Sequence, residues 1–331
     1  MKFYKSLLLI VLLIVITLPR FNWKPLPEPF NSFVGQKPFD VEQYEKYVEY
    51  FRGDSELREE LESPFTYRPL IPLLASFLPF DALTSINLIN LLLLSTGLIF
   101  LLNLLRQLKF SEALVTIGGL LFVFSFPVFY YATSGYIDAS LVGIILTANY
   151  FLVRNKFIPF IGFFILGVLI KETIIILLPV AVIYLLSKKN SKENYTKIIL
   201  IIILYFLIES MVRYFAPGSD IYVWKPSSGI LLSNLSRIKT YLSFILTFGL
   251  PGLLSIPILV SKMKNYIPKE ISYSFIIGMI ASLLLWFYSI FAAYSDGRQL
   301  WTSYPFTIVL SVYLIQLIRY QNISSKNIFS D

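Results

Sequence analysis

The stretch INLINLLLLSTGLIFLLNLL, residues 86–105, contains 20 residues without a charged side chain and decides the fold class. A helix of about 20 apolar residues spans the ~30 Å hydrocarbon core of a bilayer. Shorter apolar runs recur at residues 7–18, 114–131 and 198–208. Hydrophobic residues make up 56% of the 331 residues and charged residues only 15%, whereas soluble domains are about a quarter charged. The sequence therefore predicts an all-α, polytopic transmembrane helical bundle.

Ten segments have the composition and the flanking residues of membrane crossings. The first follows Lys2 and Lys5, and we expect it to be an uncleaved helix because no small-residue cleavage site follows it. Two others are short, since 14 residues of helix extend only about 21 Å. The ten predicted crossings are residues 4–19, 83–105, 111–131, 137–153, 157–170, 173–186, 197–212, 240–260, 271–293 and 301–318.

The charges between these segments orient the chain. Segments assigned to the cytoplasm, including both termini, carry 15 basic and 4 acidic residues, against 13 basic and 16 acidic residues outside. This distribution follows the positive-inside rule. Merging 157–170 with 173–186 would invert every later loop, although the sequence leaves open whether both are full crossings. The net charge of +8 is thus explained by cytoplasmic loops and indicates no nucleic-acid partner. We expect a multi-pass protein of the cytoplasmic (plasma) membrane.

We expect a single transmembrane domain, residues 1–331, with extracytoplasmic loops at 20–82 and 213–239. The first loop opens rich in proline and continues into an amphipathic helix over 39–61 that suits a membrane surface. Its apolar side is formed by Val41, Tyr44, Tyr47, Val48 and Phe51. The apolar segment 70–80 is too short to span and predicts a second, interfacial or re-entrant helix.

The chain contains no cysteine and no histidine. This excludes a thiol nucleophile, a disulfide framework and a histidine zinc site. Catalysis would have to use Asp, Glu, Lys, Arg, Tyr, Ser or Thr. No metal ligand is assigned, and any metal ion would be a hard, oxygen-bound one such as Mg²⁺ or Mn²⁺.

Ionisable side chains at membrane depth are costly and mark candidate functional sites. Under the predicted topology they gather at the outer ends of the helices. Arginine and lysine suit phosphate binding, and a carboxylate beside an apolar wall can serve as a general base. The sequence thus predicts a polar site that opens outward. Its candidates are Asp40, Arg68, Asp138, Lys171, Glu172, Glu209, Arg213, Asp296 and Arg298.

Structural explanations compete with a functional role at each position. Asp40 and Asp138 could cap the helices that follow them. Lys171 and Glu172 could satisfy each other within a turn between two helices. Arg68, directly before a proline, could reach a lipid headgroup.

Four short motifs lie at the outer ends of the predicted helices. They are FDVEQY (39–44), YRPLIP (67–72), YID (136–138) and GVLIKET (167–173). In this order, over residues 1–190, the chain resembles the GT-C superfamily of polyprenyl-phosphate-dependent glycosyltransferases. That superfamily includes protein O-mannosyltransferases and aminoarabinose transferases. Val41 stands where a second acid would complete a paired-carboxylate motif.

The resemblance implies a membrane glycosyltransferase of the cell envelope with an extracytoplasmic active site. It would transfer a sugar, with inversion, from a polyprenyl-phosphate donor in the membrane lipid to a glycan, lipid or protein acceptor. Asp40 would be the catalytic general base. The implied substrate-binding residues are Arg68, Asp138, Lys171, Glu172 and Arg298.

Other classes of function stay open. One is a transporter or flippase of lipid-linked or anionic solutes, although transporters usually place charges near the membrane midplane and show inverted repeats. Another is a lipid-linked polysaccharide polymerase or ligase, but those enzymes typically use histidine. The last is a non-enzymatic membrane subunit of an envelope polysaccharide assembly.

Overall fold

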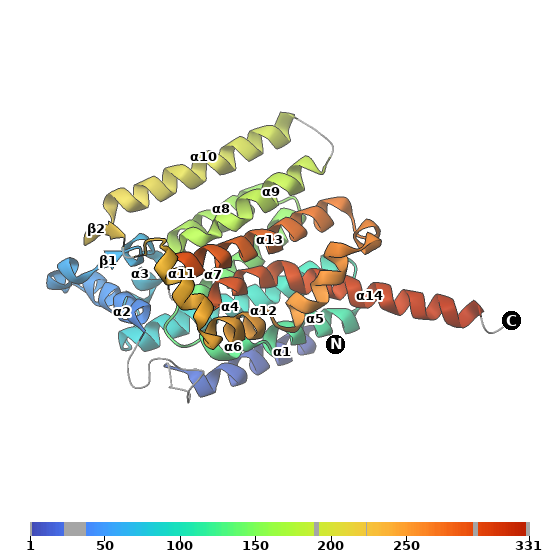
Figure 1. The fold of residues 1–331 in the computed structure, drawn as a ribbon, viewed down its shortest axis with the longest axis horizontal. Coiled ribbons are helices and arrows are strands. Elements are labelled where there is room, and N and C mark those ends of the chain that lie inside the picture. The colour runs from blue at the N-terminus through green and yellow to red at the C-terminus, as the bar shows by residue number, and fades with distance from the viewer. Residues whose placement is uncertain (1, 23–37, 189–191, 223, 294–296, 329–331) are drawn as a thin grey trace.

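The computed structural model describes residues 2–22, 38–188, 192–222, 224–293 and 297–328, which are almost entirely helical (Figure 1). The helices are α1 (Lys2–Thr17), α2 (Phe39–Phe51), α3 (Leu70–Ser76), α4 (Ala82–Gln107), α5 (Glu112–Val123), α6 (Phe126–Tyr131), α7 (Asp138–Val153), α8 (Phe157–Ile170), α9 (Leu177–Leu186), α10 (Lys192–Phe215), α11 (Ser228–Ser236), α12 (Ile238–Val260), α13 (Lys269–Ala292) and α14 (Tyr304–Ile328). Short 3-10 turns are η1 (Leu18–Arg20), η2 (Ser55–Glu60), η3 (Phe65–Tyr67), η4 (Glu172–Ile176), η5 (Lys262–Tyr266) and η6 (Arg298–Ser303). The predicted all-α class is confirmed.

Within the described residues, five helical segments are long and apolar enough to cross a membrane. They are α4, α10, α12, α13 and residues 298–319, where η6 continues into α14. Shorter apolar helices add α5, α7, α8 and the combined η4–α9 segment. Each of the ten predicted crossings coincides with one or two of the observed helices. The chain is therefore a helical protein with the character of a membrane protein, and the number of crossings stays a prediction.

Two predicted helices differ most from the observed ones, and the short helix predicted over 70–80 ends as α3 at Ser76. The segment 111–131 divides into α5 and α6, because Pro127 in the first turn of α6 cannot continue the helical hydrogen bonds of α5. The amphipathic helix predicted over 39–61 ends at Phe51, since Gly53 takes a φ of +112° and η2 follows. Its predicted apolar side does face the protein, as Val41 and Tyr44 are buried.

The two predicted outer loops meet through a pair of short strands. β1 (Glu62–Ser63) lies parallel to β2 (Ser219–Tyr222). Gly218, with a φ of +83°, lets the second loop approach closely, because a side chain there would meet the backbone of Leu61. This contact holds the segment after α10 against the segment that leads to Arg68.

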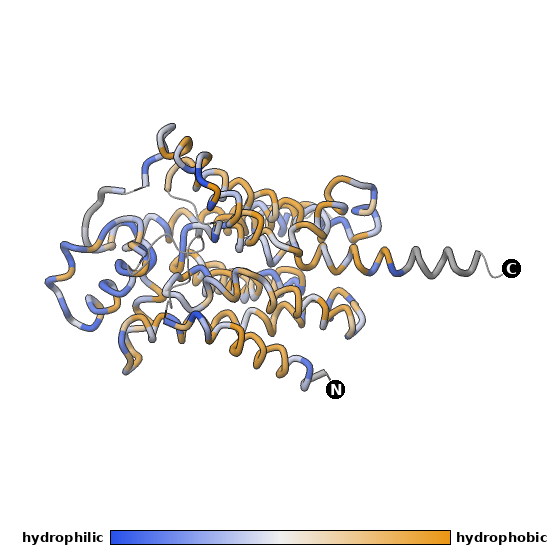
Figure 2. The backbone as a smooth tube through the Cα atoms, turned by 60° about the horizontal axis from the view of Figure 1, so that its bottom comes forward, coloured by the Kyte–Doolittle hydropathy of each residue, from blue (hydrophilic) through white to orange (hydrophobic). Residues whose placement is uncertain are grey.

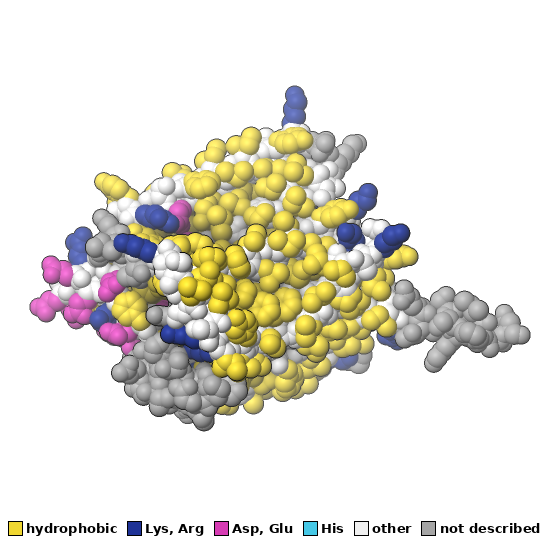
Figure 3. All heavy atoms as spheres, in the orientation of Figure 1, with side chains coloured by type: hydrophobic (Ala, Val, Ile, Leu, Met, Phe, Trp, Pro, Cys, Tyr) yellow, Lys and Arg dark blue, Asp and Glu magenta, His cyan; other side chains and the backbone are white. Residues whose placement is uncertain are grey.

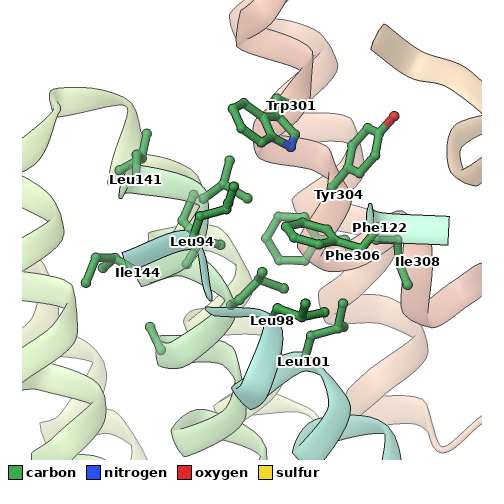
Figure 4. Packing of buried hydrophobic residues seen from close by; sticks show 14 of the residues in the cluster. Leu94, Leu98, Leu101, Phe122, Leu141, Ile144, Trp301, Tyr304, Phe306 and Ile308 are labelled. Atoms are coloured by element: carbon green, nitrogen blue, oxygen red, sulfur yellow. The ribbon is translucent and has the colours of Figure 1, made fainter. Parts of the chain in front are cut away.

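The middle of the bundle is apolar and closely packed. Figure 4 shows part of this cluster, in which side chains of α4, α5, α7 and α14 interdigitate. The helices α4 and α7 approach through Gly97 and Gly143, since a Cβ atom on either glycine would meet backbone atoms of the other helix. Small residues at such crossings allow close helix packing in membranes.

The two ends of the bundle differ in charge. In Figure 1 both termini lie at one end, and α2, α3 and the strands lie at the other. Hydrophobic residues follow the helices between the ends, and hydrophilic residues concentrate around α2 (Figure 2). On the face seen in Figure 3, acidic side chains gather at the α2 end together with basic ones, whereas the opposite end shows basic side chains.

Candidate functional site

Six ionisable side chains meet at the α2 end of the bundle, and they are the six site residues predicted from the sequence. They come from five separate segments of the chain, and most of them lie where a helix or a 3-10 turn begins or ends. They are Asp40 in the first turn of α2, Arg68 after η3, Asp138 at the start of α7, Lys171 and Glu172 where α8 gives way to η4, and Arg298 at the start of η6. We call them the six-residue network.

The most deeply buried pair of the network is formed by Lys171 and Asp138. Lys171 Nζ donates a hydrogen bond to Asp138 Oδ1 at 2.6 Å, with side chains only 5% and 2% exposed. Lys171 has an extended backbone (φ −165°) between α8 and η4, so it interrupts the helix at this point. A charge shielded to this degree is costly unless it is paired. Each of the two groups therefore depends on the other.

Arg298 connects this pair to α2. Its guanidinium contacts the carboxylate of Asp40 and lies 3.9 Å from Asp138 Oδ2. The guanidinium carbon also lies 4.0 Å from the centre of the Tyr136 ring, a distance at which the ring face attracts a cation. Arg298 thus stands between two carboxylates and rests on an aromatic ring.

Arg68 forms the other half of the network with Glu172. Its Nε and Nη2 atoms donate to the two carboxylate oxygens of Glu172 at 2.9 and 2.5 Å, and Nη1 donates to the Tyr44 hydroxyl at 2.6 Å. The rings of Phe65 and Trp224 lie 5.5 and 5.3 Å from its guanidinium carbon. Burial opposes the charge of Arg68, but the Glu172 carboxylate and Tyr44 hold its pKa well above the ordinary value. Burial likewise raises the pKa of Tyr44.

The structure argues against the simpler explanations of these residues. The helix α2 begins at Phe39 without a side-chain cap, so the carboxylate of Asp40 does not cap it. Asp138 is itself the first residue of α7 and binds Lys171 instead. Lys171 and Glu172 pair with different partners rather than with each other. Arg68 is fully buried and therefore makes no headgroup contact.

The network is balanced in charge and uneven in exposure. Three carboxylates face three cations. The side chains of Glu172 and Asp40 are 22% and 14% exposed, whereas the three cations are at most 8% exposed. The groups that a ligand can reach most easily are thus carboxylates, and each cation is already held by one.

The remaining candidates lie beside the network or cannot be placed. Arg213 pairs with Glu209 on α10, and its guanidinium lies 5.1 Å from the Tyr67 ring, next to Arg68 in the sequence. Asp296 lies outside the residues that the structure describes. Within the described ranges, no three acidic side chains come together as ligands of a metal ion.

The sequence did not indicate that neutral residues hold the network. Tyr44 stands on the predicted apolar side of the amphipathic helix, Tyr136 in the YID motif and Trp224 in the predicted outer loop 213–239, and none of the three is among the predicted site residues. Asn87 and Asn90 offered a clearer signal, because they are amides inside the apolar run 86–105. Both are fully buried.

No family model, no curated protein and no solved structure matches this chain. The resemblance to GT-C glycosyltransferases therefore rests on the motifs alone, and the function has to be argued from the geometry of the site.

Proposed function

We propose that this protein is a membrane glycosyltransferase that transfers a sugar from a polyprenyl-phosphate donor to an acceptor at the extracytoplasmic face. In this proposal the chain crosses the cytoplasmic membrane ten times, with both termini inside and the α2 end outside. The basic residues of the predicted inner loops support this orientation. One observation carries the proposal: six ionisable residues from five distant segments converge at the end of an apolar bundle.

Asp40 is the proposed general base. Its carboxylate is partly exposed and is held by Arg298, so it can meet an acceptor from outside. The acceptor oxygen attacks the anomeric carbon on the side opposite the phosphate and passes its proton to Asp40. The bond between the anomeric carbon and the phosphate oxygen breaks, and the electron pair stays on the phosphate. This displacement inverts the configuration of the sugar.

The charge balance of the network explains how Arg298 would assist. Before the reaction, the three carboxylates and three cations cancel. When Asp40 takes up the proton, it no longer neutralises Arg298, and the network gains a net positive charge. The departing phosphate gains negative charge in the same step. The interaction is therefore stronger in the transition state than in the ground state, as catalysis requires.

The other two pairs would position the donor phosphate. Arg68 has the fork geometry that suits a bidentate oxyanion, and Lys171 offers a compact charge. Both are bound to carboxylates in the present structure, so a phosphate would have to share or exchange those partners. If a hard divalent ion such as Mg²⁺ or Mn²⁺ takes part, the carboxylates of Asp40 or Glu172 would hold it, and it would stabilise the negative charge of the departing phosphate.

The test is turnover of a defined donor. Purified protein supplied with a polyprenyl-phosphate sugar and an acceptor should release free polyprenyl phosphate. Asp40→Asn should lower this rate by about 10²–10⁴-fold, the usual contribution of a general base. Glu42→Gln is the matched control, since Glu42 lies on the same helix, is 49% exposed and pairs with Lys46 at the surface. Equal loss in both variants would refute the role of Asp40.

One observation favours a transporter as the second candidate. The helix α12 contains a break at Gly249 (φ +54°), two residues before Pro251. Interrupted helices are typical of transporters, where they form ion and substrate sites. Proteoliposomes that move a lipid-linked or anionic solute without consuming a donor would support this alternative over the transferase.

A further inference from the structure

A tight turn between α6 and α7 lies directly beneath the Asp40–Arg298 pair. Two side chains of α4 hold the backbone of this turn. Asn87 Oδ1 accepts a hydrogen bond from the Gly135 amide at 2.8 Å, and Asn90 Nδ2 donates to the Tyr136 carbonyl at 2.6 Å. Ser140 donates to Asn90 Oδ1 at 2.6 Å. Both the nitrogen and the oxygen of the buried Asn90 amide therefore make hydrogen bonds.

The turn contacts Arg298, packs against the neighbour of Asp40 and continues into Asp138. The ring of Tyr136 lies under the guanidinium of Arg298, at 4.0 Å. Gly135 (φ +89°) packs so closely against Val41, the neighbour of Asp40, that a Cβ atom would overlap the valine side chain. Ile137 leads directly into Asp138. A displacement of this turn would therefore move the Tyr136 ring that supports Arg298 and also the backbone next to Asp40 and Asp138.

The amides stand where the sequence would otherwise favour apolar residues. Asn87 and Asn90 interrupt the apolar run 86–105, and burying an amide is unfavourable unless its hydrogen bonds are made. Neither side chain joins α4 to the helical backbone of α7. Instead, both bind the irregular backbone at 135–136. Asn90 also accepts from the Ser140 hydroxyl on α7, and Asn87 also donates to Asn22, but the backbone that the two amides bind is that of the turn.

We infer that Asn90, with Asn87, is a positioning residue that holds the 133–137 turn and so sets the guanidinium of Arg298 against Asp40. Asn90 acts through the Tyr136 carbonyl and ring, and Asn87 through the amide of Gly135. The effect on catalysis rests on the proposed function. The geometric effect does not, because it concerns only the pairing of Arg298 with residue 40.

A thiol at position 40 provides a readout that needs no substrate. The chain has no cysteine, so Asp40→Cys introduces the only thiol. A nearby guanidinium favours the thiolate and lowers the thiol pKa. The rate of maleimide labelling as a function of pH reports that pKa. In this background, Arg298→Gln gives the value expected when the pairing is lost.

Asn90→Leu in the Asp40→Cys background should move the labelling profile to higher pH, as Arg298→Gln does. At neutral pH this should appear as labelling slower by several-fold. Asn149→Leu is the matched control: Asn149 is also a buried amide, it lies on α7, and both of its polar atoms have no partner among the described residues. A profile for Asn90→Leu that coincides with that of Asn149→Leu would overturn the inference.

Two milder variants keep the test valid if Asn90→Leu does not fold. Asn87→Asp retains the oxygen that accepts from Gly135 and loses only the donor to Asn22, which lies outside the turn, whereas Asn90→Asp loses the donor to the Tyr136 carbonyl of the turn. The profile should therefore shift in Asn90→Asp and stay in place in Asn87→Asp. Equal profiles in both would contradict the inference. The labelling result stands even if no sugar donor is ever consumed, so failure of the proposed function is distinguishable.

Discussion

The middle of the bundle and its α2 end are both buried, but they bury opposite chemistry. In the middle, Leu98, Phe122 and Phe306 belong to one apolar cluster (Figure 4). Lipid tails are as apolar as these side chains, so the hydrophobic effect gives little preference for helix contacts over lipid contacts. Close van der Waals packing therefore stabilises the cluster. At the α2 end, Lys171 and Asp138 are nearly as well shielded, and desolvating each ion costs several kcal/mol.

Packing therefore explains the apolar middle of the bundle but not the charged α2 end. Well-packed apolar residues in place of a buried ion pair are often neutral or stabilising, by about 1–4 kcal/mol. A network of six charges is therefore not the most stable solution for the α2 end. Its presence there is explained more readily by a use for the charges, as the proposed transferase requires.

Removing the Lys171–Asp138 pair in two steps should give the largest effect. Lys171→Met alone should destabilise the protein by about 3–5 kcal/mol, because it leaves a buried carboxylate that Arg298, at 3.9 Å, replaces poorly. The double variant Lys171→Met with Asp138→Leu should regain most of that loss. Thermal unfolding of purified protein in detergent measures both. A double variant as unstable as the single one would mean that the pair stabilises the fold.

A corresponding change in the apolar middle should be smaller and purely structural. Gly143→Ala places a methyl group against the backbone of Leu93, and we expect a loss of about 1–3 kcal/mol from overpacking. Gly162→Ala is the control, because a Cβ atom there meets nothing within 4 Å. Similar unfolding temperatures for the two variants would show that α4 and α7 can move apart at Gly143 without loss of stability.

Arg68→Lys should separate charge from geometry at the α2 end. Lysine keeps the positive charge but loses the two-pronged contact with Glu172 and the hydrogen bond to Tyr44. We expect a loss of about 1.5–2 kcal/mol, at the lower end of the range for a hydrogen bond to a charged group, because the positive charge itself is kept. Arg58→Lys at an exposed position serves as the control. No difference between these variants in denaturant unfolding would mean that charge alone matters at position 68.

The sequence predicted the helices and the members of the network, but not their pairing. Apolar runs such as 86–105 determine which segments are helical and buried. Charges near the ends of these runs indicate where each helix ends relative to the membrane. Neither pattern tells which helices are neighbours. The pairing of Arg68 with Glu172, and of Asp40 with Arg298, depends on chain segments 104 and 258 residues apart. The helix predicted over 39–61 runs past the observed end of α2 at Phe51, because helical spacing of apolar residues alone does not indicate the positive φ of Gly53.

The smallest expected effect on stability concerns Tyr222 in β2, two residues before Trp224, whose ring lies against Arg68. Burial raises the pKa of Tyr222 to about 12, from about 10 in the unfolded chain. The folded protein thus holds this proton more tightly, so the associated stability is present below pH 10 and is lost as the pH rises from 10 to 12. We expect less than about 1 kcal/mol, because the side chain is partly exposed. Tyr222→Phe should make unfolding less sensitive to pH in that window, and an unchanged alkaline slope would contradict this.

We propose that the α2 end is a catalytic site and not a structural clamp. The decisive measurement is the turnover and the unfolding temperature of Asp40→Asn, taken on one preparation beside the wild type. We expect the release of polyprenyl phosphate to fall by at least about 10²-fold while the unfolding temperature stays close to that of the wild type. Full release of polyprenyl phosphate by Asp40→Asn, or a loss that appears only together with unfolding, would contradict it.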